Sequence, residues 1–503
     1  MNYLQRKKLA FMSIANRVKG FIRAVSGVPP LVLTDCSDGD SLINYRVYGQ
    51  SVQDGVPSPD NPAEVQCVGD RTVNLLSPYT GSKTENGVTW IGNEDGSLTV
   101  EGTPTGYTAI TRTFTAKPNT TYCFSDCNNI YGLACDVTEY GEDGTIVKSS
   151  GGFKAHTITT TAETSAVRVG IKRSNDGVTI PKTTIYPQVQ EGTTATPYEP
   201  YGKYKITVTA RGRNLLDKDN ANITPLYYNG GKYASGVAIK TFYLTCEAGK
   251  QYSITCSPKG GRLTVSFCTY FPLVSRDAFG YATDAAFTSI TVTAPPAAEY
   301  MLVEFYNGNK CESGFTYEDA LKYIMVEQGE VTEYEPYYAP VTTNIYLDEP
   351  LRKIGDYADY IDFEGGKVVR NAVDIKLSGN FTVYNDNVWQ CSTGINLYMT
   401  KKELCTHFIS SSSSTVLGMN NKNQLGKYVA LSGATGLNMT IDEFNAWVDE
   451  NDVHYFAALD EPTEEAISLP KLPTFKGTTI YEVGTTINPS GMDVEYYSSL
   501  KGE

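Results

Sequence analysis

The chain has 503 residues and an unusual balance of 36 Tyr against 3 Trp and 3 His, with 45 Gly and 24 Pro. This length exceeds what one hydrophobic core serves, and the turn-rich, tyrosine-rich composition favours several mainly β folding units. The formal net charge of −14 argues against nucleic acid as the main partner, because phosphate backbones are bound by clustered Lys and Arg.

Membrane and secretion signals are also missing from the sequence pattern. There is no run of about 18 apolar residues, and Arg17, Lys19 and Arg23 interrupt the apolar stretch near the start. We therefore expect neither a transmembrane segment nor a signal peptide. The eleven cysteines are odd in number and mostly scattered singly, which does not indicate a disulfide framework. Synthesis in a reducing cytoplasm is the expectation.

Residues 1–34 predict a basic amphipathic helix. Six basic residues and no acidic residue occur there, and apolar residues recur at steps of three and four from Phe11 to Val25. Such a helix can lie on a membrane, but in an acidic protein it is more often a docking element. We expect it to dock on a partner or on the acidic body of the protein.

Residues 35–69 predict a short strand followed by a linker. The segment from Ile43 to Tyr48 alternates apolar and polar residues. Pro57, Pro59 and Pro62 follow, and three prolines in six residues favour a stiff, extended connector.

An internal repeat is the strongest structural signal in the sequence. Four landmarks recur in the same order in residues 70–205 and 206–341. The landmarks are Asn74-Leu75-Leu76 and Asn214-Leu215-Leu216; Lys117 to Tyr122 and Glu247 to Tyr252; Val189 to Gly192 and Val326 to Gly329; Tyr198-Glu199-Pro200-Tyr201 and Tyr334-Glu335-Pro336-Tyr337. The last pair is expected to seal the edge of each unit and to direct the chain onward.

Each copy of the repeat contains alternating segments spaced as a β-sandwich requires, with one face of each strand inward. The expected strands are 97–100, 107–114 and 166–171 in the first copy, and 238–244, 262–268 and 300–306 in the second. Asp95-Gly96 and Asp143-Gly144 are hairpin-type turn signals. The sequence therefore predicts two tandem jelly-roll-like β-sandwiches.

Residues 342–503 predict an α+β domain. Thr400 with Glu403 and Thr440 with Glu443 each match a capping box, in which side chain and backbone bond reciprocally at a helix start. We expect helices near 400–409 and 440–451, among strands such as 453–459 and 479–483.

Several short motifs resemble a known family in their order along the chain. Tyr48 to Gly55 with Pro57 to Pro62, the Asn-Leu-Leu starts and Tyr-Glu-Pro-Tyr ends of the repeats, and Gly491 to Tyr497 resemble minor structural or receptor-binding tail proteins of phages and prophages of Gram-positive bacteria. The repeats resemble the carbohydrate-binding-like, galactose-binding-type modules of those proteins.

The resemblance implies a virion component near the tail tip, often a homotrimer, that is made in the host cytoplasm. It would join other tail proteins through its N-terminal segment and touch host cell-surface glycans through its modules. No catalytic motif comes with the resemblance.

Enzyme signatures are poorly represented, and we expect no catalytic activity. The sequence has no Gly-x-Ser-x-Gly elbow, no phosphate-binding loop and no His-Glu-x-x-His. Cys405 and His407 lack a second ligand pair, so we expect no metal site there. Two acidic turns, 35–40 and 93–95, offer oxygen ligands for Ca²⁺, although an ordinary polar turn is the favoured interpretation. No other cofactor is expected.

Aromatic side chains are the better candidates for binding, because a sugar presents a face of C–H groups that stacks on Tyr or Trp. Each of these residues is also explained by a place in a core. The candidates are Trp90, Tyr107, Tyr131, Tyr140, Tyr227, Tyr228, Tyr233 and Tyr270.

Three functions remain open on the sequence alone. The leading one is a tail protein that adheres to the host surface through glycan contacts. The second is an architectural part of the tail or baseplate without a ligand. The third is a glycan depolymerase whose paired carboxylates would come together from separate segments.

Overall fold

The computed structural model describes residues 31–36, 46–125, 131–153, 157–174, 177–219, 226–229, 232–235, 238–256, 262–269, 278–279, 289–306, 322–398, 400, 402–411, 413, 416–421 and 427–484. Within these ranges the fold is mainly β, as the composition predicts. The N-terminal helix predicted over residues 1–34 lies outside the described residues up to residue 30.

A central unit, which we call the hub, is assembled from segments far apart in the sequence. Its first sheet has the antiparallel order β1 (Leu31–Cys36), β39 (Gly477–Gly484), β17 (Tyr204–Gly212), β27 (Val341–Leu347), and β5 (Asp70–Arg71) also pairs with β17. Its second sheet has the order β2 (Arg46–Tyr48), β30 (Tyr360–Asp362), β31 (Lys367–Lys376), β38 (His454–Ala466), β34 (Leu397–Tyr398), with β35 (Leu404–Cys405) also on β38.

One hydrophobic core joins the two hub sheets. Strand β17 alternates in burial, so Ile206 and Val208 point to this core from the first sheet together with Tyr481. Val47 and Ile361 reach it from the second sheet. The alternation is what a strand with one buried face requires.

The first module, residues 72–203, is inserted between hub strands β5 and β17. Two strand layers enclose one core, which is centred on fully buried Trp90. One layer has the order β12 (Ile146–Phe153), β11 (Ala134–Tyr140), β14 (Ala166–Arg173), β9 (Thr108–Thr115). The remaining strands form two sheets. A three-stranded sheet has the order β13 (Thr157–Thr159), β10 (Thr121–Ser125), β16 (Gln188–Glu191). A four-stranded sheet has the order β15 (Ile180–Ile185), β8 (Leu98–Gly102), β7 (Val88–Gly92), β6 (Ser82–Glu85).

The second module, residues 213–340, repeats the strand order of two of these three sheets. The order β20 (Ala238–Thr245), β25 (Tyr300–Tyr306), β22 (Arg262–Cys268), β23 (Ala278–Phe279) corresponds to β9, β14, β11, β12. Likewise β24 (Ser289–Thr293), β21 (Gln251–Thr255), β26 (Met325–Gln328) corresponds to β13, β10, β16. A hairpin of β18 (Leu226–Asn229) and β19 (Lys232–Ser235) precedes β20. The internal repeat predicted from the landmarks is therefore confirmed as a repeated strand order.

A buried asparagine ties together the two ends of the first module. The side-chain oxygen of Asn74 accepts hydrogen bonds from the backbone amides of Leu76 (3.0 Å) and Val189 (3.2 Å). Its side-chain nitrogen donates to the carbonyl of Glu199 (3.1 Å). One side chain thus joins the segment that enters the module to the two segments that close it, and we call this set of bonds the asparagine clasp.

The second module has the same asparagine clasp at Asn214. The side-chain oxygen accepts from the amides of Leu216 (3.0 Å) and Val326 (3.2 Å), and the nitrogen donates to the carbonyl of Glu335 (3.1 Å). Asn74 and Asn214 are both 3% exposed, so water cannot replace these partners.

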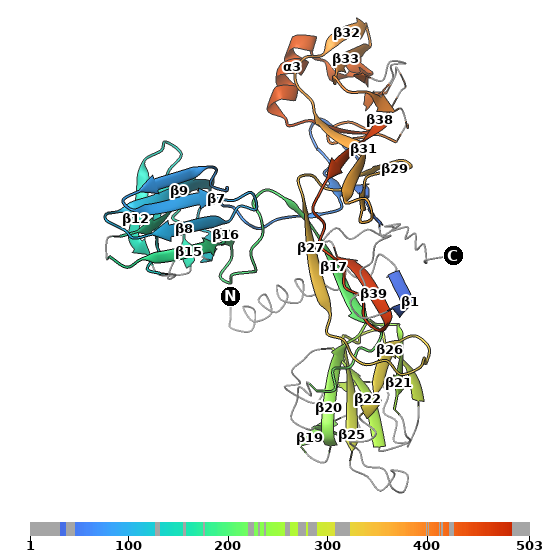
Figure 1. Cartoon of the computed structure of the whole chain (residues 1–503). Helices are drawn as coiled ribbons and strands as arrows, with labels where there is room; N and C mark the ends of the chain where they lie inside the picture. The colour runs from blue at the N-terminus through green and yellow to red at the C-terminus, as the bar shows by residue number, and fades with distance from the viewer. Residues whose placement is uncertain are drawn as a thin grey trace, which may run out of the picture.

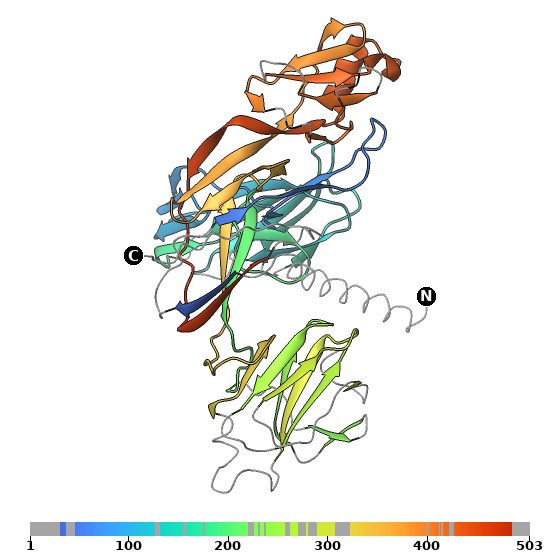
Figure 2. The same cartoon turned by 90° about the vertical axis from the view of Figure 1, so that its right-hand side faces the viewer.

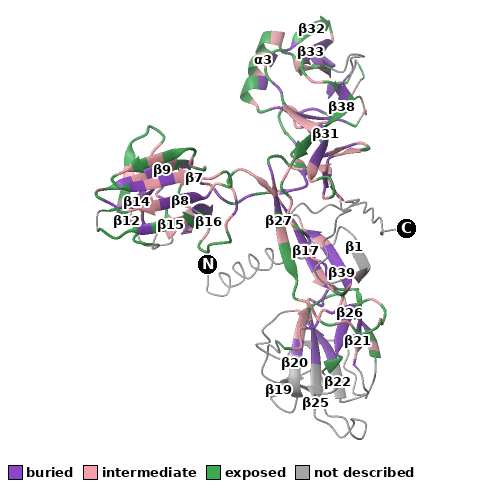
Figure 3. Ribbon diagram, in the orientation of Figure 1, coloured by how far each residue is buried: buried purple, intermediate pink, exposed green. Residues whose placement is uncertain are grey.

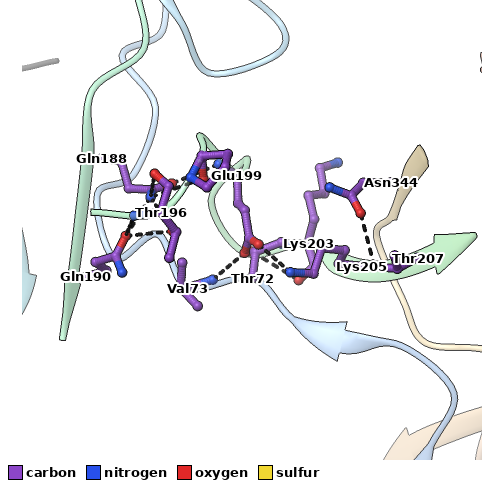
Figure 4. Close-up of polar contacts among 11 residues, drawn as sticks. Thr72, Val73, Gln188, Gln190, Thr196, Glu199, Lys203, Lys205, Thr207 and Asn344 are labelled. Atoms are coloured by element: carbon purple, nitrogen blue, oxygen red, sulfur yellow. Dashed lines mark hydrogen bonds and ion pairs between the residues drawn. The ribbon is translucent and has the colours of Figure 1, made fainter. Parts of the chain in front are cut away.

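The glutamates of the two Tyr-Glu-Pro-Tyr motifs fasten the modules to the hub. Glu199 accepts a bond from the Val73 amide (2.9 Å) and forms an ion pair with Lys205 of β17 (Figure 4). Glu335 accepts bonds from the amide (3.0 Å) and the hydroxyl (2.7 Å) of Thr478 in β39. The motif therefore acts at the base of each module, where the chain re-enters the hub.

A third module, which we call the head, lies within residues 377–453. Its sheet has the order β32 (Thr382–Asn385), β33 (Val388–Ser392), β37 (Tyr428–Ser432), β36 (Gly418–Asn420). Helix α3 (Ile441–Glu450) and the 3-10 turn η1 (Ala434–Leu437) pack with it. The capping box at Thr440 and Glu443 is present, which confirms the helix predicted over 440–451.

The helix predicted near 400–409 is wrong. The amide of Thr400 donates to the Glu403 carboxylate (3.0 Å), as in a capping box, but Leu404 and Cys405 then pair with β38 as strand β35. The two residues have the local chemistry of a helix start, and pairing with a strand about 50 residues later overrides it.

Three segments also differ from the sequence-based division of the chain. Residues 31–34, placed in the N-terminal unit after the expected end of its helix near Gly27 to Pro30, belong to strand β1. Within residues 35–69, β2 lies in the predicted strand, but the segment predicted as a linker supplies the hairpin of β3 (Ser51–Gln53) and β4 (Val65–Cys67). Residues 206–212, placed in the second module, belong to hub strand β17. For β1 and β17 a distant partner strand, β39, decides the structure, whereas β3 and β4 form a local hairpin.

The three modules extend from the hub in different directions (Figure 1), and the first module lies behind the hub in the rotated view (Figure 2). Strands β31 and β38 run from the hub into the head as an antiparallel pair whose register shifts between Arg370 and Ala372. Buried residues follow the strands of each module (Figure 3), in agreement with a separate hydrophobic core for each.

We predict that Asn214→Ala destabilises the second module selectively. Two buried amides, of Leu216 and Val326, would lose their acceptor, at a cost of about 1–3 kcal/mol each. Amide hydrogen exchange should accelerate across β21 and β26 and stay unchanged in the first module. Asn344→Ala, which removes an exposed asparagine from β27, is the matched control. Equal exchange in both variants would contradict the role of the clasp.

Candidate binding cleft

The candidate site is a cleft of about 690 Å³ between the base of the second module and the hub. This volume falls within the range of small-ligand sites in proteins, about 300–1,000 Å³. The hub, the segment that enters the module, strand β20 and the segment that leaves the module all contribute to its walls.

An ion pair between two adjacent hub strands forms one wall of the cleft. Arg211 in β17 contacts Glu482 in β39 through Nε (2.9 Å) and a terminal nitrogen (2.7 Å) on the same carboxylate oxygen. Both side chains are partly exposed, at 15% and 24%. A guanidinium group carries five N–H donors, so this pair can also offer donors and an acceptor to a ligand.

Tyrosine rings also line the cleft. Tyr243 comes from β20, and Tyr337 and Tyr338 come from the segment that returns to the hub. Tyr338 stacks on Phe475 with ring centroids 4.9 Å apart, and a side chain at Gly212 would approach its ring to 3.1 Å. The position of this ring is therefore fixed by packing before any ligand binds.

The innermost part of the cleft is neutral at pH 7. Burial raises the pKa of Cys246 to about 12 and the pKa of Tyr252 to about 12. The Tyr252 hydroxyl accepts a hydrogen bond from the amide of Glu247 (2.8 Å). Thiol and phenol both stay protonated, so the ionic groups are confined to the rest of the cleft.

This combination of aromatic faces and paired donors and acceptors suits a ligand with both C–H faces and hydroxyl groups. It does not resemble a metal centre. Within the described ranges, no three His, Cys, Asp or Glu residues lie where they could hold a metal ion.

The candidate residues of the first module do not form one site. Trp90 is fully buried and donates from its indole nitrogen to the Thr108 hydroxyl (3.1 Å), so its proposed contact with a ligand is wrong. Tyr107 (56% exposed) and Tyr131 (48% exposed) lie towards the same end of the sheet. Tyr140 lies at the other end, beside Arg168.

For three of the four candidates of the second module, the structure describes the backbone but not the side chain. Tyr227, Tyr228 and Tyr233 lie on the β18–β19 hairpin, where Tyr228 and Tyr233 are directly paired. Tyr270 lies outside the described residues. None of the four candidates of the first module lines the cleft.

In the acidic turn at residues 93–95, the side chains of Asn93 and Asp95 form hydrogen bonds within the turn, which agrees with an ordinary polar turn. One Asp95 oxygen accepts from the amide (3.0 Å) and the hydroxyl (2.6 Å) of Ser97, and Asn93 donates to the same hydroxyl (2.9 Å). These bonds stabilise the hairpin between β7 and β8. Of the other acidic turn, residues 37–40 lie outside the described residues.

No family model matches the chain, and no curated protein matches it. Solved structures of infectious bursal disease virus align with it over most of both chains. The Gt strain structure has 10% identity and covers 96% of this chain and 91% of its own, with a TM-score of 0.10. The VP2 subviral particle has 9% identity, coverages of 92% and 86%, and a TM-score of 0.10. Similarity this low carries no argument about fold or function.

In the part of the chain that the structure describes, no helix combines the length and apolarity needed to cross a membrane.

We predict that Cys246 reacts very slowly with iodoacetamide in the folded protein. Because only the thiolate reacts, burial that raises the pKa to about 12 should slow alkylation at pH 8 by at least about tenfold relative to the unfolded chain. Peptide mass spectrometry of native and urea-unfolded samples measures the ratio. Equal rates in the two samples would contradict the buried, neutral end of the cleft.

Proposed function

We propose that this protein is a structural component of a phage tail that adheres to the host surface, and that the cleft between the second module and the hub holds a host glycan. The protein acts by binding, without a catalytic step. It resides in the virion after synthesis in the host cytoplasm.

The observation that carries the proposal is the chemistry of the cleft. Rigid tyrosine rings can stack against the C–H face of a sugar, and the Arg211–Glu482 pair can exchange hydrogen bonds with its hydroxyls. Tyrosine offers a large contact area with little loss of conformational entropy, which suits recognition of a polar surface.

The arrangement of the chain supports adhesion as well. Two modules of the same strand order, which we take to be jelly-roll-like sandwiches, extend from one hub. Several linked weak sites raise the effective concentration at a surface without any new contact. The order of motifs that resembles tail proteins of Gram-positive phages favours the same function, with residues 1–34 as the attachment to other tail proteins and a homotrimer as the assembly.

We predict that Tyr243→Ala weakens binding of the full-length protein to host cell-wall glycans about tenfold, because it removes a stacking face from the cleft. Binding to immobilised wall polysaccharide measures the effect. Tyr323→Ala is the matched control, because Tyr323 is a 49% exposed tyrosine of the same module outside the cleft lining.

Two other results would replace this proposal. If the wild-type protein binds no wall polysaccharide, the protein is an architectural part of the tail. If it releases reducing ends from the polysaccharide and one acidic substitution abolishes release, it is a depolymerase.

A further inference from the structure

A second aromatic groove lies on the hub, away from the cleft. Its volume is about 380 Å³, and it is lined by Tyr48, Lys353, Asp356, Tyr357, Tyr360 and Asn371. These residues come from β2, from the hairpin of β28 (Lys353–Ile354) and β29 (Tyr357–Ala358), and from β30 and β31. None of them lines the cleft at the second module.

Two pairs of tyrosine rings accompany this groove. Tyr48 and Tyr360 are directly paired on β2 and β30, with ring centroids 5.2 Å apart. Tyr357 lies 4.9 Å from Tyr398 of β34. Arg46 lies 5.0 Å from the centre of the Tyr360 ring. All four tyrosine rings are partly exposed, so part of each ring is accessible to a ligand.

A buried carboxylate fixes the backbone beneath the groove. Asp359, which is 0% exposed, lies between groove residues in the chain. It accepts hydrogen bonds from the amides of Asn371 (2.7 Å), Ala372 (2.8 Å) and Arg352 (3.1 Å). The Asn371 side chain also donates to the carbonyl of Ala358 (2.7 Å). The groove is therefore preorganised, which lowers the entropic cost of binding.

The polar residues of the groove are of both charge types. Neither Lys353 nor Asp356 forms an ion pair with any residue that the structure describes. The pKa of Tyr357 is raised, first by its hydrogen bond with Tyr398 and also by the nearby carboxylates of Asp356 and Asp460. Phenol groups, the Lys353 side chain and the Asp356 carboxylate thus face the same solvent-filled space.

We infer that this groove is a second carbohydrate site, which takes a neutral hexose unit of a glycan. The sugar stacks on the tyrosine rings, Asp356 accepts from its hydroxyls and Lys353 donates to them. The opposite charges of these two side chains give no preference for an anionic sugar. A peptide strand fits less well, because β30 is already paired on both sides and β2, at the edge of the sheet, offers only three residues for pairing. This inference deepens the proposed function and rests on it for the source of the glycan.

The test titrates the full-length protein with neutral hexose trisaccharides of glucose, galactose and mannose. Calorimetry gives the affinity, and amide exchange of residues 353–362 and 209–217 reports the groove and the cleft separately. We expect at least one trisaccharide to slow exchange at 353–362. Tyr357→Ala should weaken its binding at least tenfold, and Tyr357→Phe, which keeps the ring face, should stay within about threefold of wild type.

Two further variants complete the test. Asp356→Asn, at an exposed turn position, removes the acceptor charge without disturbing the core and should also weaken binding. Tyr384→Ala is the matched control, because Tyr384 is a 65% exposed tyrosine of the head, and it should bind as wild type does.

The outcomes separate this inference from the proposed function. Protection at 209–217 alone, with wild-type affinity in Tyr357→Ala, would overturn the groove and leave the cleft in place. Protection at 353–362 alone would support the groove and contradict the cleft as a glycan site. If none of the trisaccharides slows exchange at 353–362, the inference is wrong.

Discussion

An asparagine side chain closes the base of each of the two repeated modules, where that module joins the hub. A module inserted between two hub strands must enter and leave at one place, since the flanking strands lie side by side in the same sheet. Asn74 and Asn214 meet this constraint with the same three bonds, each joining the entering segment to the segments that close the module. Because the amide partners are buried, no solvent molecule can substitute for the clasp.

The repeat and helix α3 were predictable because their signals are local. The Asn-Leu-Leu start encodes one bond of the clasp, from the Leu216 amide to Asn214, within three residues, and the capping box at Thr440 and Glu443 encodes a helix start within four. The hub was not predictable in this way. Strand β17 pairs with β39, more than 260 residues later, and alternation within 204–212 does not say which sheet the strand joins.

The candidate site was not predicted either, because its residues are also brought together by long-range strand pairing. Arg211, Glu482 and Tyr338 come from three separate segments, and only the pairing of β17 with β39 brings the first two together. Sequence reasoning instead favoured tyrosines within each repeat, together with Trp90, whose alternating strand places it in the core. The signal that was present is Tyr337, the last residue of the repeated Tyr-Glu-Pro-Tyr motif, which lines the cleft where the chain re-enters the hub.

Excision of the first module tests the insertion architecture most directly. The amide of Thr72 donates to the carbonyl of Lys203 (3.0 Å), and Arg71 pairs with Tyr204, so an Asn-Gly turn in place of residues 73–202 can close β5 and β17 into a hairpin. Amide exchange of the shortened chain should show β17, β27 and β39 as protected as in the full chain. Loss of protection in these three strands would contradict a hub that folds independently of the module inserted into it.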